Sequence, residues 1–124
     1  MIKIAICDDD ILMRDRLGAM IDDYAVSHQL TVGCEKFTSP LDLLAQIERG
    51  AKFDILFMDV IMPGENGIDA ATEIRNYDGN VKIIFLSSSP EFAIQSYSVG
   101  AYFYPRPLTA GISYYPLHTY LLTV

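Results

Sequence analysis

Acidic and hydroxyl side chains follow three apolar segments of this sequence, each at the point where the segment ends. They are the run Asp8-Asp9-Asp10 after residues 2–7, Asp59 after residues 55–58, and Ser87 after residues 81–86. Such apolar runs are typical of strands that are buried on both faces of a parallel sheet. The carboxyl ends of parallel strands meet at one edge, where open α/β sheets bind their ligands. If these strands are neighbours, the polar groups converge on one pocket.

The chemistry of such a pocket follows from its oxygen atoms. Adjacent carboxylates repel one another unless a cation lies among them, and oxygen ligands favour a hard ion such as Mg²⁺. A carboxylate beside Mg²⁺ and a hydroxyl donor can accept a phosphoryl group as a mixed anhydride, a reaction that needs mainly positioning and charge neutralisation. The structural alternatives are that Asp59 caps the following turn and that the serines cap a helix. Ser89, directly before Pro90, suits a cap better than Ser87 does.

The segments between these residues predict alternating strands and helices. The expected strands are residues 2–7, 31–37, 55–58, 81–86 and 101–104. The expected helices are residues 11–27 after Asp10 as cap, Pro40 to Gly50 after Ser39 as cap, Asn66 or Gly67 to Asp78, and Phe92 to Gly100. In the first helix, apolar residues from Leu17 to Tyr24 recur at helical spacing, and Arg14 is expected on the wet side. In the third, Ile68, Ala71, Thr72 and Ile74 are expected to face inward. A last helix over residues 110–123 is opposed by Pro116.

This alternation indicates the α/β class, with a parallel sheet covered by helices on both faces. The periodicity of the sequence does not reveal the order of the strands. With 124 residues, the chain is long enough for one domain with a core.

Composition and charge exclude several classes of protein. Apolar residues make up 51% of the chain and charged residues 20%, which is typical of a globular domain. A net charge of −7 argues against nucleic acid binding by this segment. Only four apolar residues follow Lys3 before the aspartates, and no run is long enough to span a membrane, so we expect a cytoplasmic protein without a signal peptide. Cys7 and Cys34 are expected to be free thiols.

Three motifs together resemble the receiver domain of two-component response regulators, from the first strand to about residue 108. They are residues 4–10 (IAICDDD), residues 57–64 (FMDVIMPG) followed by Gly67, and residues 83–89 (IIFLSSS). Residues 88–93 with Ser96 and Tyr97 are most similar to receivers of LytTR-type transcription regulators. The resemblance implies a single domain over residues 1–124, with the flavodoxin-like (βα)5 fold and strand order 2-1-3-4-5. It also implies a signalling switch rather than an enzyme, with a sensor histidine kinase as partner and transcription as one possible output.

The same resemblance assigns roles to residues of this chain. Asp59 would accept the phosphoryl group, Asp9 and the backbone carbonyl of Ile61 would bind Mg²⁺ together with Asp59, and Asp8 would do so through water. Ser87 would contact the phosphoryl group and move on activation. An aromatic residue would turn inward with it, and two positions are open for this residue, Phe103 and Tyr104.

The end of the sequence departs from the family pattern. Receivers carry a lysine before a proline after the fifth strand, and this chain has Arg106 there, one residue early. Residues 105–124 are atypical, and the Tyr-rich tract of residues 90–120 has few charges, which favours an interface for a homodimer. A rearranged terminus is the alternative. Two other functions stay open: a pseudo-receiver that only binds partners, for which Arg106 argues, and a small Mg²⁺-dependent phosphatase, against which the short chain argues.

Overall fold

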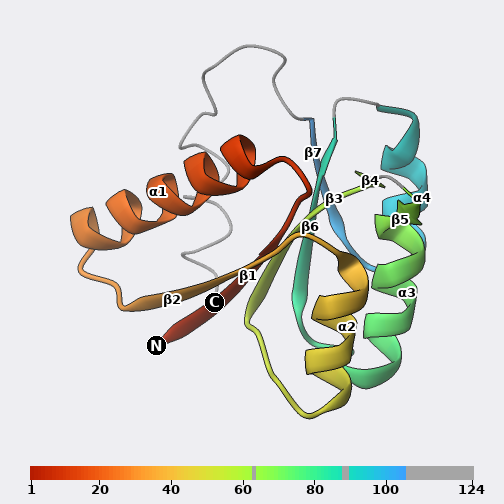
Figure 1. Ribbon diagram of the computed structural model, residues 1–124, viewed down its shortest axis with the longest axis horizontal. Coiled ribbons are helices and arrows are strands. Elements are labelled where there is room, and N and C mark those ends of the chain that lie inside the picture. Colours follow the sequence, from red (N-terminus) through yellow and green to blue (C-terminus); the bar gives the residue numbers. More distant parts are fainter. Residues whose placement is uncertain (63, 88–89, 106–124) are drawn as a thin grey trace.

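The computed structural model describes residues 1–62, 64–87 and 90–105 (Figure 1). The strands are β1 (Ile2–Cys7), β2 (Val32–Phe37), β3 (Ile55–Asp59), β4 (Ile61–Met62), β5 (Glu65–Asn66), β6 (Lys82–Ser87) and β7 (Tyr102–Pro105). The helices are α1 (Ile11–Ser27), α2 (Pro40–Glu48), α3 (Gly67–Tyr77) and α4 (Ala93–Ser98), with a 3-10 turn η1 (Pro90–Phe92) before α4. The predicted helix over residues 110–123 lies outside the described residues.

A parallel sheet forms the centre of the molecule, in the order β2-β1-β3-β6-β7. All its strand pairs are parallel, so that Cys7 lies opposite Met58, and Asp59 opposite Leu86. The predicted parallel α/β fold is therefore confirmed, and β2, β1, β3 and β6 take the order that the resemblance implied. Beyond β6, Tyr102 of β7 pairs with Ile84. This order makes neighbours of the three strands that end in acidic or hydroxyl residues.

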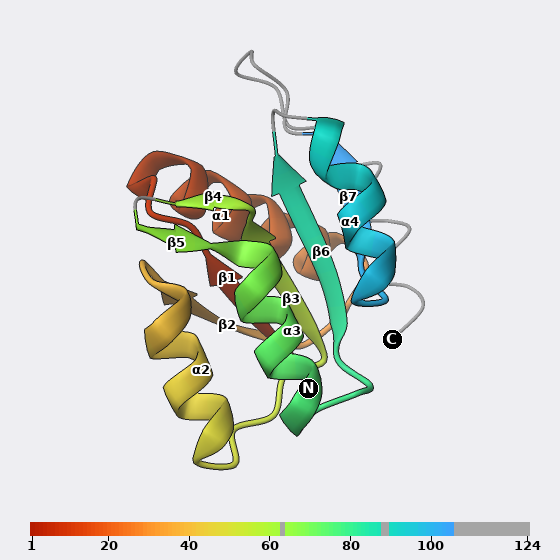
Figure 2. The same cartoon turned by 90° about the vertical axis from the view of Figure 1, so that its right-hand side faces the viewer.

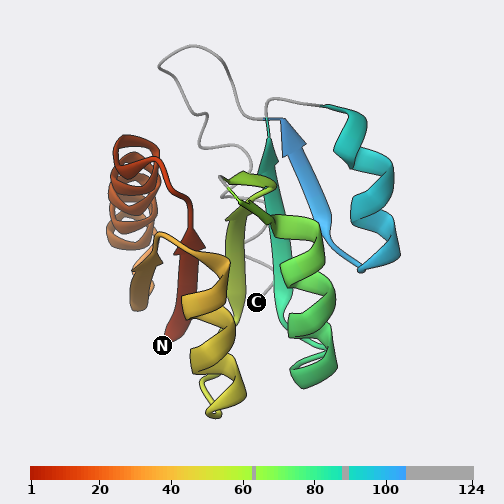
Figure 3. The same cartoon turned by 45° about the vertical axis from the view of Figure 1, so that its right-hand side comes forward.

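Helices cover the two faces of the sheet, with α1 on one face and α2, α3 and α4 on the other (Figures 2 and 3). Each face has its own apolar cluster, because neighbouring residues along a strand point to opposite faces. Ile4, Ile6 and Phe57 pack with Leu17 and Ile21 of α1. The other cluster contains Ala5, Cys7, Leu56, Met58, Ile83 and Phe85 from the sheet, with Leu43, Ala71 and Ile74 from α2 and α3. Burial on both faces explains the unbroken apolar runs in the sequence.

The predicted caps begin the helices where the sequence placed them. Asp10 accepts hydrogen bonds from the backbone N–H groups of Leu12 (3.0 Å) and Met13 (3.3 Å). Ser39 accepts one from Leu41 N–H at 3.2 Å, with Pro40 as the first residue of α2. Asn66, rather than Gly67, is the cap of α3. Each cap satisfies backbone donors that the first turn of a helix leaves unpaired.

Two details of the predicted elements are wrong. Thr72 is exposed instead of facing inward, and its hydroxyl donates to the carbonyl of Ile68 at 3.0 Å, which satisfies it at the surface. Arg14 is partly buried instead of lying on the wet side of α1. Both depend on packing between elements, which helical spacing does not specify. The segment after Asp59 does turn, at Gly64, and the short antiparallel strands β4 and β5 flank that turn.

Candidate metal and phosphoryl site

Three carboxylates meet at the carboxyl edge of the sheet. Asp8 and Asp9 follow the end of β1, and Asp59 is the last residue of the adjacent strand β3. Each offers one oxygen, and these oxygens lie within 4.8 Å of one another. The cluster that the sequence predicted is therefore assembled by the neighbouring positions of β1 and β3. Asp10, the third member of the run, caps α1.

The burial of these carboxylates decides what they can bind. Asp8 is 3% exposed and Asp59 is 7% exposed, whereas Asp9 is an exposed residue. Asp8 is held by its neighbours, because its N–H donates to the carbonyl of Phe37 (3.0 Å) and its carboxylate accepts from Asp10 N–H (2.9 Å). Like charges this close favour a divalent cation, and a hard ion that binds through one or two carboxylates and keeps water fits this set. The donor atoms present therefore fit Mg²⁺, with Asp9 on the solvent side.

Gly67 allows the chain to pass close behind Asp59. Its N–H donates to the carbonyl of Val60 at 2.8 Å. A Cβ at this position would lie 3.0 Å from the Cα of Val60 and closer still to the carbonyl oxygen of Asp59. A side chain here would therefore push α3 away from the acidic cluster. The sequence placed Gly67 at the possible start of a helix and beside a motif, but it could not show this contact, because the contact is made with another segment.

The remaining predicted site residues are placed only in part. Ser87 is the last residue of β6, one position beyond the residue opposite Asp59, so its backbone lies at the same edge as the carboxylates. Ile61 opens β4 and pairs with Asn66. Phe103 and Tyr104 lie in β7, opposite Phe85 and Leu86, and both remain candidates for the inward-turning aromatic. Arg106 lies outside the described residues.

Arg75 is a structural residue that the sequence did not reveal. Its Nε donates to the carbonyl of Val99 (2.8 Å), and its two terminal nitrogens donate to the carbonyls of Val81 (2.6 Å) and Gly100 (3.0 Å). It thus joins the end of α3 to the start of β6 and to the turn after α4. No local pattern could have indicated this, since two of the acceptors lie 24 and 25 residues away.

Helix α4 presents apolar and aromatic side chains to solvent. Ile94 is 81% exposed and Tyr97 is 82% exposed, whereas Ser96 is its buried residue. Tyr102 of β7 is also exposed. These residues belong to the Tyr-rich tract that the sequence singled out.

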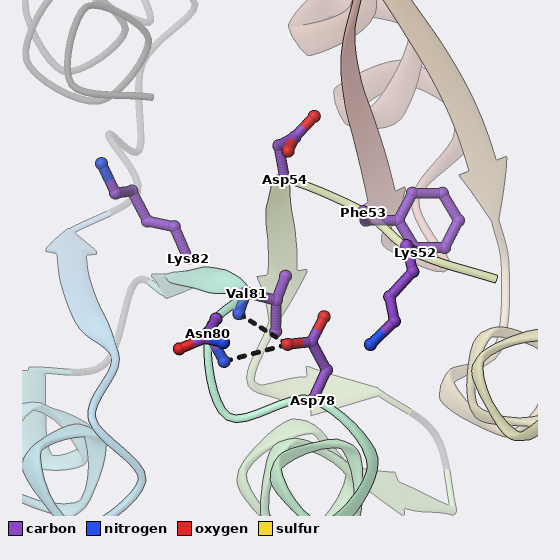
Figure 4. A pocket seen from close by; sticks show the side chains of 7 residues that line it. All are labelled: Lys52, Phe53, Asp54, Asp78, Asn80, Val81 and Lys82. Carbon is purple, nitrogen blue, oxygen red and sulfur yellow. Dashed lines mark hydrogen bonds between the residues drawn. The ribbon is translucent and has the colours of Figure 1, made fainter. Parts of the chain in front are cut away.

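A separate hollow lies at the opposite edge of the sheet, where β3 and β6 begin (Figure 4). Its volume is about 390 Å³, and its lining includes Lys52, Asp54 and Asp78. The carboxylate of Asp78 accepts hydrogen bonds from the N–H groups of Asn80 (2.9 Å) and Val81 (3.2 Å). These bonds give Asp78 the role of closing the turn into β6, and none of the residues predicted for chemistry lines this hollow.

Comparison with known proteins identifies the family. The family described as "Response regulator receiver domain" matches residues 4–104. The chain belongs to this family. The receiver is 36% identical over 103 residues to the chemotaxis protein CheY of Thermotoga maritima, a match that covers 80% of this chain and 79% of CheY. It is 28% identical over 105 residues to the sensory transduction protein LytT of Bacillus subtilis, covering 82% of this chain and 40% of LytT.

Solved structures share the fold of this receiver. CheY4 of Vibrio cholerae superposes with a TM-score of 0.79 at 24% identity, covering 100% of this chain and 98% of CheY4. The response regulator TrrA of Thermotoga maritima, solved in complex with Mg²⁺-BeF, superposes with a TM-score of 0.77 at 20% identity. The match covers 99% of this chain and 98% of TrrA.

Membership of the family carries general consequences. Receiver domains act in two-component systems as signalling modules that are generally not enzymes, interact with sensor histidine kinases, bind Mg²⁺ at an acidic pocket and switch on phosphorylation. The relatives include transcriptional regulators, and this receiver spans about 40% of the length of LytT. Among the described residues, no helix has the length and apolar character that crossing a membrane requires.

Proposed function

We propose that this receiver is a phosphorylation-dependent switch in which Asp59 accepts a phosphoryl group from a sensor histidine kinase. One observation supports the proposal most directly: Asp59 ends a central strand with its oxygen within 4.8 Å of those of Asp8 and Asp9. Asp59 is nearly buried, so its geometry is fixed by packing, while the exposed Asp9 leaves the cluster open to a partner. Phosphoryl transfer depends on such positioning and on neutralised charge.

In the transfer, a carboxylate oxygen of Asp59 attacks the phosphorus of a phosphorylated histidine on the kinase. An oxygen–phosphorus bond forms, the nitrogen–phosphorus bond breaks, and its electron pair returns to the imidazole. We assign Asp9, Asp59 and the backbone carbonyl of Ile61 to hold Mg²⁺, with Asp8 acting through water. The ion, when bound, supplies positive charge against the carboxylates and the incoming phosphoryl oxygens. Ser87 is assigned to receive a phosphoryl oxygen from the end of β6.

The experiment is labelling by a small phosphodonor. With acetyl phosphate and Mg²⁺, intact-mass spectrometry should find one added phosphoryl group, acid-stable and base-labile as an acyl phosphate is. Asp59→Ala should abolish the label, and Asp69→Ala, which removes an exposed carboxylate from α3, should keep it. A labelled Asp59→Ala variant would place the acceptor elsewhere.

Metal binding is tested separately by calorimetry without a phosphodonor. Asp9→Asn and Asp59→Asn should each weaken Mg²⁺ binding at least tenfold, because each removes a charged ligand. Unchanged affinity in both variants would show that the ion binds elsewhere.

The second candidate function is a pseudo-receiver that binds partners without being phosphorylated. The observation in its favour is Arg106-Pro107, where the family carries a lysine before proline, since the planar fork of an arginine differs in size and shape from an ammonium. Failure of the wild-type protein to accept phosphate, with Mg²⁺ binding retained, would select this function.

For the output we propose self-association through the α4 face, defined by Ile94, Tyr97 and Tyr102. Exposed aromatic and aliphatic side chains supply contact area at low entropic cost. A phosphoryl mimic with Mg²⁺ should raise the sedimenting mass, and Tyr97→Glu should prevent the increase. In Ser87→Ala, phosphorylation should persist without the change in mass. Constant mass in the wild type would exclude this face as the output surface.

The proposal also covers the extent of the domain, its relation to nucleic acid and its location in the cell. We propose one receiver domain over residues 1–124, with no direct contact to nucleic acid, because the net charge is −7. Cys7 and Cys34 are free thiols, which supports a cytoplasmic location. In a larger regulator, control of transcription would then belong to another domain.

A further inference from the structure

A second hollow with a basic lining lies beside the carboxyl end of β2, between α1 and α2. Its volume is about 550 Å³, and the side chains that line it include Arg14, Lys36, Asp42, Gln46 and Arg49. We refer to it as the basic hollow. We propose that the basic hollow binds a small ligand that carries oxyanion groups, phosphate or carboxylate. The proposal does not depend on phosphorylation of Asp59.

The charge of the basic hollow contrasts with that of the chain. The chain has 9 lysine and arginine residues against 16 aspartate and glutamate residues. Three of those cations, Arg14, Lys36 and Arg49, line this one hollow together with a single carboxylate, Asp42. They come from α1, from β2 and from the residue that ends α2, so the fold gathers them from separate segments. An anion is attracted to such a concave positive site despite the negative net charge.

Arg14 is the residue that points most directly to a ligand. Its Nε is buried and has no hydrogen-bond partner among the described residues. A buried donor without an acceptor destabilises the fold, and a partly desolvated cation does so more strongly unless an opposite charge compensates it. Arg14 also lines the basic hollow, so an oxyanion seated there would place an opposite charge beside this cation.

The ion pair in the same region leaves the two arginines available. Lys36 Nζ lies 3.0 Å from a carboxylate oxygen of Asp15, so this lysine already has an anionic partner. No salt bridge within the described part of the chain engages the side chains of Arg14 or Arg49. Guanidinium groups bind carboxylate and phosphate through paired hydrogen bonds. Arg14 and Arg49 would therefore hold the oxyanion, whereas the charge of Lys36 is already balanced by Asp15.

The basic hollow adjoins the acidic cluster without including it. Phe37 is a shared boundary: it lines the hollow, and its carbonyl accepts the hydrogen bond from Asp8 N–H. None of the three clustered carboxylates lines the hollow. An anion here would thus be separate from the phosphoryl group proposed for Asp59.

The test is a titration of the full chain in chelator, so that no Mg²⁺ draws phosphate to the acidic cluster. The probes are inorganic phosphate and citrate, with chloride at matched ionic strength as reference, and the readout is the amide NMR shift of residues 36–49. Arg14→Gln and Arg49→Gln should each weaken binding about tenfold to a hundredfold, the effect of losing a charged hydrogen bond. Arg16→Gln is the matched control, because Arg16 is an exposed cation on α1 outside the lining.

Each outcome decides the proposal. Saturable binding of phosphate or citrate that Arg14→Gln weakens and Arg16→Gln keeps supports it, and the probe that binds tells phosphate from carboxylate. If Arg14→Gln and Arg16→Gln weaken anion binding equally, the attraction is a general effect of charge and the proposal is overturned. Shifts no larger than those with chloride would also overturn it. Circular dichroism checks the fold of each variant. If Arg14→Gln proves unstable, Arg49→Gln, at the exposed end of α2, provides a second measurement of anion binding.

Discussion

The Nε of Arg75 donates a hydrogen bond to the backbone carbonyl of Val99 at 2.8 Å, across the gap between α3 and the end of α4. Val81 and Gly100 accept from the same guanidinium. Burial lowers the pKa of Arg75, and the carboxylate of Asp78 acts in the opposite direction. This one side chain fixes the C-terminal end of α4, a helix whose N-terminal end has no side-chain cap.

Arg75→Ala should destabilise the fold by about 2–4 kcal/mol, because four backbone carbonyls, those of Asp78, Val81, Val99 and Gly100, lose a charged donor. Urea unfolding measures the loss. Amide exchange should increase first in residues 96–101, which contain the released turn. Arg16→Ala is the control, since substitution of this exposed arginine should change stability by no more than about 0.5 kcal/mol. A similar loss in both variants would contradict the role of the Arg75 contacts.

Removal of one clustered carboxylate should stabilise the protein when no metal is present. Oxygens of Asp8, Asp9 and Asp59 lie within 4.8 Å of one another, and like charges at this distance repel by about 1–3 kcal/mol in a partly screened site. Asp59→Asn should therefore unfold at higher urea than wild type in chelator, and saturating Mg²⁺ should reduce or reverse the difference. Asp23→Asn, on the exposed side of α1, should leave the urea midpoint unchanged both in chelator and in Mg²⁺. Earlier unfolding of Asp59→Asn in chelator would show that its carboxylate is compensated by other contacts.

Gly67→Ala should disturb the acidic cluster by displacing the backbone that carries Asp59. The added Cβ would meet the backbone of Asp59 and Val60, and overpacking of this kind costs about 1–3 kcal/mol. We expect a lower unfolding midpoint and weaker Mg²⁺ binding. Gly79→Ala is a matched control, because a Cβ there has nothing within 4 Å and no positive φ is required. If Gly67→Ala binds Mg²⁺ as wild type does, the close contact does not position Asp59.

Cys34 should react slowly with alkylating reagents until the solution is strongly alkaline. Burial raises the pKa of its thiol from 9.0 to about 11; the Asp22 carboxylate adds to the shift and Lys36 opposes it. The folded state therefore holds this proton more tightly than the unfolded chain does. The resulting contribution to stability is complete below pH 9 and is lost as the pH rises through 11.

The measurement is the rate of iodoacetamide labelling of Cys34 against pH, read by peptide mass so that Cys7 is counted separately. The native rate should still be rising near pH 11, whereas in urea it should level off near pH 9. A native rate that levels off near pH 9 would contradict the effect of burial.

Much of the fold could be predicted from local sequence. The apolar runs identified β1, β3 and β6 because strands buried on both faces are mostly apolar, with polar residues such as Lys3 and Lys82 near their ends. Asp10 and Ser39 were predicted as caps, since a cap bonds backbone groups two or three residues away. The carboxylates of Asp8, Asp9 and Asp59 were singled out because they follow apolar runs that predict buried strands.

What the sequence determined by itself was therefore the set of elements, their caps and the residue types at the ends of the strands, all of which depend on neighbours along the chain. The tertiary structure decided which of those residues meet. Only the pairing of β1 with β3 brings Asp59 to Asp8 and Asp9. Only the packing of separate segments explains the contact of Gly67 with Asp59 and Val60, the bonds from Arg75 to Val99 and Gly100, and the buried Nε of Arg14. Each of these involves atoms of different elements or loops, and helical or strand periodicity carries no information about such partners.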